Sequence, residues 1–433
     1  MPILFRTQRH GSRATPADRR SPDQRRRWML LAGLAGLALS GCSSGASLPT
    51  PSVVYLAIGA NADQTVDTNL REDYQGRLAL MQAGFQQLHP GTTFQLGIYP
   101  DRQMQAAIQR RSHAGLAPDL LIISGDLALQ LLEAGLVDPF PADAALQNQF
   151  DPDVLNRLRS PDGRLAGLPL LVQTQLACFD RRRLPEAPRT LAELLEVSAA
   201  GQAIGLAVDP VNLLWSAGSL GAIPALEQLA RRRPLSPEQE QSLEQWLAWL
   251  QNASDQQRVT FFGSQQTTDA EFMAGRLAWI PCRSTMLPQM RRRLGEALAV
   301  APLPDGPDHR ASPVNRLRVM ALGRNSSGAG RQRAVAFSRF GANPLTQRAL
   351  TLGSHTVLPA NRFVAVPVQS SQVLRSMQEA ADQGLQANEL IALLHSDRNR
   401  PARLRNLLIQ LVYGELSARA ARQKLVQILA ATP

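Results

Sequence analysis

Ser43 is the first residue whose surroundings suggest chemistry, because Gly41 to Gly45 reads G-x-S-x-G. In hydrolases this pattern sets a serine nucleophile on a sharp turn between a strand and a helix. Here the pattern falls between an apolar run and a linker of small residues, Ser43 to Pro51, so no strand leads into it. We therefore predict that Ser43 is not a nucleophile and that the chain is not an enzyme.

The histidines do not form a metal-binding pattern. None of them stands in H-E-x-x-H or in paired spacing, and no P-loop or dinucleotide fingerprint follows the first predicted strand. We expect neither a metal ion nor a cofactor. The six histidines are His10, His89, His113, His309, His355 and His395.

Polar residues follow two apolar runs that predict buried strands. Asn61, Asp63 and Gln64 come after the run 52–59, and Asp126 comes after a second run. Ligands of parallel α/β sheets bind at the carboxyl ends of the strands, so these residues are candidates for a binding site. For Asp126, a helix N-cap is an equally good interpretation.

The elements that position these residues alternate between strand and helix. This order indicates right-handed crossovers and a parallel sheet. The extended run 163–180 is too long for one ordinary strand and indicates a passage between two lobes. The predicted elements are strand 52–59, helix 71–90, strand 93–100, helix 104–115, strand 119–124 and helix 127–136, then helix 191–198 and strands 203–208, 277–281 and 297–301.

Length and charge indicate an exported globular protein with two domains. The chain has 433 residues and a formal net charge of +11, but eight arginines against two acids precede Cys42. The arginine triplets at 181–183, 231–233 and 291–293 lack the interleaved aromatic residues of a nucleic-acid surface, so we expect no nucleic-acid partner. Cys178 and Cys282 could pair only if their Cα atoms lie within about 7 Å. Because both lie in apolar surroundings, we expect buried free thiols.

The amino-terminal segment has the features of an export signal. Arg25 to Arg27 precede the apolar run 28–40, which is shorter than the roughly 20 residues that span a bilayer. Leu39-Ser40-Gly41-Cys42 resembles the lipobox of bacterial lipoproteins, which implies cleavage before Cys42 and its acylation. We expect a signal at 1–41, a tether at 42–51 and a lipid-anchored protein on the periplasmic face of the membrane or the cell surface. The export route, Sec or twin-arginine, stays open.

Several segments in order resemble the extracellular solute-binding proteins of carbohydrate importers, the maltose-binding-protein type. Their motifs correspond to Ala117–Leu120, Glu133–Pro139, Leu165–Arg189, Ala270–Ile280, Ala301–Pro304 and Tyr413–Ser417. The resemblance implies an α/β, two-lobed periplasmic-binding-protein-like fold with a ligand cleft between lobes joined by hinge crossovers. It implies lobes at 52–171 plus 318–359 and at 172–317 plus 360–433. It also implies a monomer that serves an ABC permease and its ATPase.

The resemblance also implies a ligand site. After Ile280 this chain departs from the family pattern, since it has an arginine where an aromatic residue is often found. For Trp215, packing in the protein core is the alternative to a ligand contact. The implied ligand-binding residues are Asn61, Asp63, Gln64, Asp126, Gln173, Asp209, Asn212 and Trp215, and the candidates added because of the departure are Arg283, Ser284, Arg316 and Arg318.

The nature of the solute stays open in the sequence. Only 5% of the residues are aromatic, which disfavours a long oligosaccharide held by stacked rings and favours a small sugar, glycoside or polyol. The arginines suit a carboxylate or phosphate, so a glycerol-phosphate or other anionic solute is the alternative. A scaffold that has lost its solute and binds a partner or acts as a sensor is the second alternative.

Overall fold

The strands of the protein form one continuous path of pairings. The computed structural model describes residues 52–60, 66, 68–385, 387–395, 397 and 399–430. The path runs β2-β1-β3-β10-β5-β8-β6-β7, with β4, β9 and β11 paired beside it. The strands are β1 (Ser52–Ala60), β2 (Thr92–Pro100), β3 (Leu120–Ser124), β4 (Val137–Asp138), β5 (Leu168–Asp180), β6 (Ile204–Ala207), β7 (Val259–Phe262), β8 (Trp279–Arg283), β9 (Leu298–Ala301), β10 (Asn315–Gly323) and β11 (Leu358–Pro359).

The first lobe is built on β2, β1, β3 and β10. β1 pairs parallel with β2 and with β3, as the alternation of strands and helices predicts. β10 does not follow that prediction, because it pairs antiparallel with both β3 and β5. The reason is its origin: β10 enters this sheet from the second lobe rather than through a crossover helix, so nothing forces it to run parallel.

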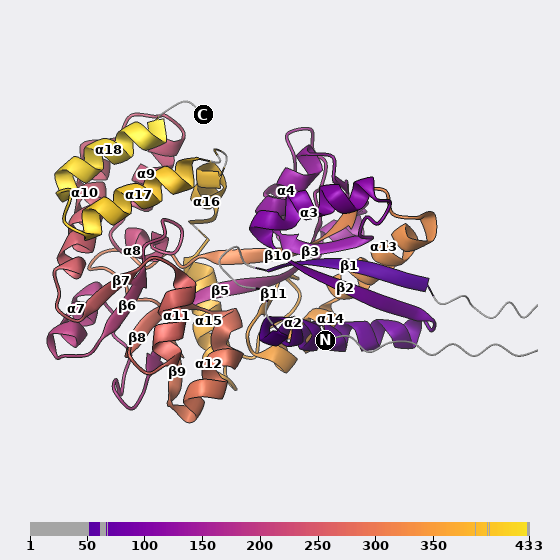
Figure 1. Cartoon of the computed structure of the whole chain (residues 1–433), viewed down its shortest axis with the longest axis horizontal. Helices are drawn as coiled ribbons and strands as arrows, with labels where there is room; N and C mark the ends of the chain where they lie inside the picture. Colours follow the sequence, from indigo (N-terminus) through magenta and orange to yellow (C-terminus); the bar gives the residue numbers. More distant parts are fainter. Residues whose placement is uncertain are drawn as a thin grey trace, which may run out of the picture. The chain divides into compact units, whose positions relative to one another are not determined.

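Helices cover both faces of this sheet. Figure 1 shows α3 and α4 on one face and α2 and α14 on the other. Leu56, Ile58, Met81 and Phe85 are almost fully buried between these layers. The helices of this lobe are α2 (Thr68–Leu88), α3 (Asp101–His113), α4 (Gly125–Glu133), α5 (Ala144–Gln147), α6 (Pro152–Asn156), α13 (Gly328–Ala342) and α14 (Pro344–Ser354).

The second lobe is built on the other end of β5 with β8, β6, β7 and β9, and its carboxyl-terminal helices pack against α9 and α10 (Figure 1). In α10, Ser236 and Gln239 bond each other's backbone amides, and Pro237 opens the helix, so its start is fully capped. The helices are α7 (Leu191–Ala199), α8 (Leu214–Ser219), α9 (Ile223–Ala230), α10 (Pro237–Ser254), α11 (Gln265–Met273), η1 (Ser284–Met286), α12 (Leu287–Leu294), η2 (Gly295–Ala297), α15 (Gln372–Gln383), α16 (Ala387–His395), α17 (Arg400–Val412) and α18 (Ala418–Ala430).

β5 belongs to both lobes. Its first half pairs with β10 as far as Thr174, and its second half pairs with β8 and β9 from Gln175 onward. The long extended run that the sequence contains is therefore a single strand of 13 residues that changes partners midway. The predicted α/β fold of two lobes joined by an extended crossover is confirmed.

The two cysteines of the second lobe are paired, so the prediction of free thiols is wrong. Cys178 on β5 and Cys282 on β8 form a disulfide with their Cα atoms 5.7 Å apart. Register explains the pairing: Cys178 lies opposite Ile280 and Leu176 lies opposite Cys282, so the cysteines are diagonal neighbours on adjacent strands. Their apolar surroundings are the shared core of β5, β8, α12 and α15.

The amino-terminal predictions lie outside the described residues. These are the signal at 1–41, the tether at 42–51 and the acylation of Cys42. Residues 51–433 form one compact unit by themselves. Within the described part of the chain, no helix combines the length and the apolar character needed to cross a bilayer.

Candidate functional site

Three consecutive residues of β5, one of them the predicted Gln173, pair with or bond three further predicted ligand-binding residues. Gln173 lies opposite Arg316 of β10, and the Thr174 amide donates to the Ser284 hydroxyl at 3.2 Å. The Gln175 side chain donates to the Asn212 carbonyl at 2.9 Å. The strand thus brings residues from three distant parts of the sequence to the point where it passes between the lobes.

Gln173 has an unusual environment at this point. Its side chain is only 6% exposed, and within the described residues its Oε1 has no hydrogen-bond partner. Buried amide oxygens are nearly always bonded. An acceptor in this state is available to a hydroxyl that enters the hinge region.

Arg318 is held inside the first lobe. It is 3% exposed, and its guanidinium donates to the carbonyls of Gly59 and Ile122, the latter at 3.1 Å. Its Nη1 lies 3.5 Å from Asp101 Oδ2. These contacts tie the carboxyl ends of β1 and β3 together, so Arg318 is a structural cation at the edge of the site.

Asp101 is a residue of this cluster that the sequence analysis missed. It follows β2 directly, so the rule that selects residues after strands could have found it. Burial raises the pKa of Asp101, the nearby Arg318 and Arg316 lower it in part, and Asp126 raises it further. A Cβ at position 59 would lie 2.0 Å from Asp101 Oδ1, so this close packing requires a glycine.

Asp126 joins the same cluster from the start of α4. It lies in the first turn of that helix, whose N-cap is Ser124, so the capping interpretation of Asp126 is wrong. Its charge acts on Asp101, and it partly opposes the lowering of the Arg157 pKa that burial causes. Asp126 therefore lies among the charged residues at the carboxyl edge of the first sheet.

The candidates of the second lobe are held in two places. Arg283 ends β8 almost fully buried, with its Nη2 3.8 Å from Asp269 Oδ2. Asp209 accepts a hydrogen bond from the Asn212 amide at 2.9 Å, which shapes the turn after β6. Both Arg283 and Asp209 lie near β5. Arg283 is opposite Gln175, and the Gln175 side chain donates to the carbonyl of Asn212, the residue that bonds Asp209.

Trp215 is corrected as a ligand contact. None of its surface is exposed, and its ring packs edge-on to Trp249 at 5.9 Å between centroids and against Trp279 at 6.0 Å. This indole forms part of the core of the second lobe, which leaves no ring face for a sugar. Asn61, Asp63 and Gln64 lie outside the described residues.

Polar contacts join the lobes beside these candidates. Arg77 of α2 donates to the Thr285 carbonyl at 2.8 Å, next to Ser284. Gln289 donates to Asp73 Oδ2 at 2.9 Å, and Arg292 lies 3.3 Å from Asp73 Oδ1. The start of α2 is thereby tied to η1 and α12. Such contacts between distant segments were not visible in the sequence.

Removing these contacts should open the lobes with little loss of stability. We expect the double substitution Asp73→Ala, Arg77→Ala to enlarge the radius of gyration measured by X-ray scattering. Because Arg292 is 57% exposed, the pair adds only about 1 kcal/mol or less to folding. A matched control is Arg276→Ala, which removes an exposed ion pair to Glu271 within the second lobe. Scattering that is the same for all three proteins would contradict a hinge held by these contacts.

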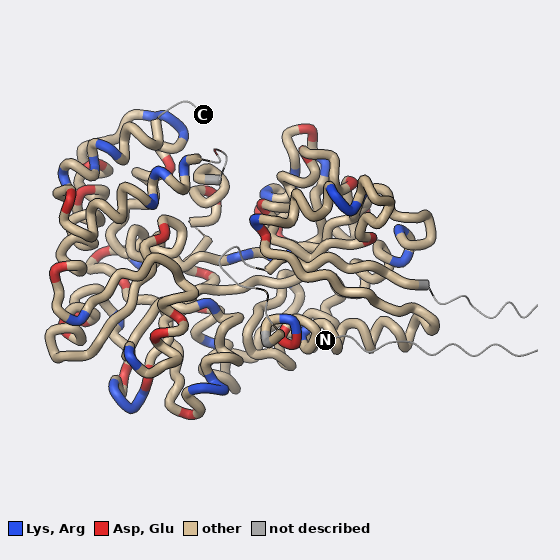
Figure 2. Tube along the Cα trace, in the orientation of Figure 1, with Lys and Arg blue, Asp and Glu red and all other residues tan. Residues whose placement is uncertain are grey.

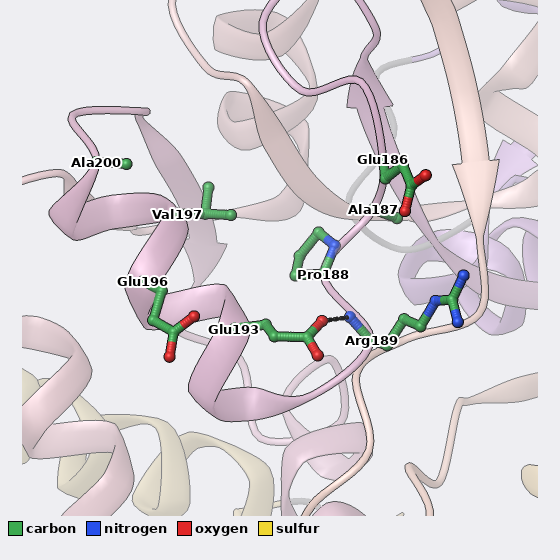
Figure 3. A pocket seen from close by; sticks show the side chains of 8 residues that line it. All are labelled: Glu186, Ala187, Pro188, Arg189, Glu193, Glu196, Val197 and Ala200. Carbon is green, nitrogen blue, oxygen red and sulfur yellow. Dashed lines mark hydrogen bonds between the residues drawn. The ribbon is translucent and has the colours of Figure 1, made fainter.

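Two pockets lie away from the candidate residues. Both adjoin the loop 186–189 of the second lobe, with volumes of about 560 and 760 Å³. Figure 3 shows the smaller one, in which the Glu193 carboxylate accepts from the Arg189 amide at 2.7 Å. Neither pocket is lined by any predicted ligand-binding residue.

Charged residues do not gather in one region of the protein. Basic and acidic residues are interspersed over both lobes (Figure 2).

Comparison with known proteins gives a clear structural result. No family model matches the chain, and no curated protein matches it. The structure is similar to the GacH receptor of Streptomyces glaucescens, solved unliganded and with acarbose, at a TM-score of 0.68 and 16% identity over 87% of this chain and 96% of that one.

Two further structures give the same picture. One is the Thermus thermophilus maltotriose binding protein bound with maltotriose, with a TM-score of 0.66 and 14% identity over 87% of this chain and 99% of that one. The other is the maltose-maltodextrin binding protein of Alicyclobacillus acidocaldarius, with a TM-score of 0.64 and 15% identity over 88% and 100%. The chain thus has the fold of maltose-binding-type proteins, as its motifs predict.

Proposed function

We propose that the protein is a lipid-anchored receptor that captures a small sugar or sugar-like solute at its hinge and delivers it to an ABC importer. The observation that carries the proposal is the polar set around residues 173–175 of β5, where residues of both lobes converge. Two of the similar structures hold sugars, acarbose in the GacH receptor and maltotriose in the maltotriose binding protein. Closure of two lobes on a solute is the movement that such a hinge permits.

The charges near the hinge favour a neutral solute over an anion. Arg318 is paired with Asp101, and Arg283 lies beside Asp269. A paired guanidinium has little net charge to offer a phosphate or carboxylate. Hydroxyls can instead bond to amide and carboxylate oxygens such as those of Gln173 and Asp209.

Solute binding is tested by thermal shift on the chain from Ser43 onward. A ligand at 100 times its dissociation constant should add about 2.7 kcal/mol of stability. We expect a disaccharide or glycoside to raise the melting temperature, and Asp126→Asn with Asp209→Asn to weaken binding at least about tenfold by calorimetry. Asp308→Asn, in an exposed turn, is the control. A shift with glycerol phosphate alone would support the anionic alternative, and no shift with any solute would support a partner-binding scaffold.

The anchor is tested separately by Cys42→Ser. The proposed lipid is attached to this thiol, so the exported variant should leave the membrane fraction and appear in the soluble one. Retention of the variant in the membrane fraction after export would contradict acylation at Cys42.

A further inference from the structure

One edge of the first sheet presents exposed apolar side chains. Because β1, β2 and β3 are parallel, their starts share an edge. Val53 is the second residue of β1, Leu88 ends the helix that leads into β2, and Leu116 lies in the loop before β3. Their side chains are 53%, 66% and 58% exposed. We call this region the amino edge.

Arginines surround these apolar side chains. Arg111 lies 4.4 Å over the ring of Tyr55 and donates to the Leu116 carbonyl at 3.1 Å. Arg333 donates to the Thr92 hydroxyl at 2.9 Å, at the first residue of β2. Arg324 follows β10 and donates to the Gly135 carbonyl at 3.2 Å. Each of these four contacts is to a neutral group, so none of them pairs one of the three positive charges with a carboxylate.

The acidic groups at this edge are largely engaged. Asp119 is buried and accepts from the Tyr55 amide at 2.9 Å. Asp138 is paired with Arg331. Glu133, at the end of α4, is the exposed carboxylate there. The amino edge therefore combines exposed apolar side chains with an excess of positive charge.

The proposed lipid on Cys42 indicates that the partner of the amino edge is a bilayer. Cys42 precedes Ser52, the first residue of β1, by a stretch that spans at most about 35 Å when fully extended. This length limits how far β1 can begin from a bilayer that holds the lipid. The start of β1, which belongs to the amino edge, is thus the first described part of the chain after the proposed anchor.

We propose that the amino edge rests on the surface of an anionic bilayer. The proposal builds on the proposed anchor at Cys42. Leu88 and Leu116 enter the interface between headgroups and acyl chains, and Arg111, Arg324 and Arg333 bind lipid phosphates. The candidate site lies at the carboxyl ends of the same strands, so this orientation turns the site away from the lipid and toward the surrounding solution.

The proposal is tested by flotation of the unacylated chain from Ser43 onward, because residues 51–433 form a compact unit by themselves. Vesicles of phosphatidylcholine are compared with vesicles of phosphatidylcholine and phosphatidylglycerol mixed two to one. We expect binding only to the mixed vesicles, and weaker binding as salt is raised. Leu88→Gln with Leu116→Gln should lower the bound fraction at least about tenfold, and Arg111→Gln with Arg324→Gln should remove the salt dependence.

The control is Leu345→Gln with Leu352→Gln on α14, which are 76% and 36% exposed and are not among the residues that define the amino edge. This variant should float like the wild type. No binding to mixed vesicles, or an equal loss in the α14 variant, would overturn the proposal. Each variant is also tested for its solute-dependent thermal shift, so a failure of solute binding is seen separately from a failure of membrane binding.

Discussion

Replacing Arg318 with methionine should lower the free energy of unfolding at neutral pH by about 3–5 kcal/mol, the range found when one partner of a buried ion pair is removed. The side chain is 3% exposed, and it bonds the carbonyls of Gly59 and Ile122 as well as facing Asp101. Methionine fills similar volume but donates no hydrogen bond. The substitution leaves the carbonyls of Gly59 and Ile122 without this donor and the Asp101 carboxylate without this nearby positive charge. Chemical denaturation measures the change.

The loss should depend on pH in a direction that identifies Asp101 as the cause. The pKa of Asp101 is raised by burial and is lowered by Arg318, so the substitution raises it further. A carboxyl whose folded pKa exceeds its unfolded value of about 3.9 favours folding when protonated, and that advantage is lost as pH rises through the folded pKa. The variant should therefore be closest to the wild type near pH 4 and fall behind as pH increases.

A second substitution tests this explanation. Adding Asp101→Asn to Arg318→Met removes the charge that the arginine offsets, so the double variant should lose the pH dependence and recover part of the stability. The same pH-independent loss in the single and double variants would show that Asp101 has no part in the effect. In that case, the carbonyl contacts of Arg318 alone would account for its cost.

Removing the disulfide should be the other large change. Cys178→Ala with Cys282→Ala should lower the free energy of unfolding by about 2–5 kcal/mol, because the bridge closes a loop with a sequence separation of 104. The expected loss of stability includes the contribution from burying the two sulfur atoms, since both cysteines are at most 1% exposed. Denaturation of the oxidised wild type and the double variant measures the difference.

The reduced wild type is the matched control for this variant. Reductant added to the folded protein should act slowly, because the buried sulfurs are out of reach until the lobe opens. Reductant added in denaturant should yield a protein about as stable as the double variant. Equal stability of the oxidised protein and the variant would contradict a stabilising bridge.

Local patterns explain why part of the fold could be predicted. β1 and β3 are nearly continuous apolar runs, β2 mixes apolar residues with Thr92, Thr93 and Gln95, and each of the three is followed by a helix, so their type and parallel pairing could be predicted from local sequence. β10 is apolar only in its second half, and its partners β3 and β5 are far away in sequence. Its antiparallel direction depends on where the chain returns from the second lobe, which no local pattern records.

The disulfide and the candidate site show the same limit. The pairing of Cys178 with Cys282 follows from the register of β5 against β8, which the sequence does not contain. The family resemblance made Trp215 a candidate and residue type made Arg318 one, and burial decided against a ligand role for the tryptophan. Asp101 follows the second predicted strand, 93–100, whereas the site candidates of the first lobe were taken from the ends of the first and third strands.

The passage of β5 through both lobes constrains how this chain can change over evolution. Residues 173, 174 and 175 reach Arg316, Ser284 and Asn212 in turn. Since neighbouring side chains of a strand point to opposite faces, inserting or deleting a single residue here would invert every later position of the strand. The half of β5 that pairs with β10 would keep its register, while the half that pairs with β8 and β9 would turn its other face to them unless a bulge absorbed the change, as at the register shift opposite Arg318 and Val319. Substitutions can therefore retune this strand more readily than changes in its length.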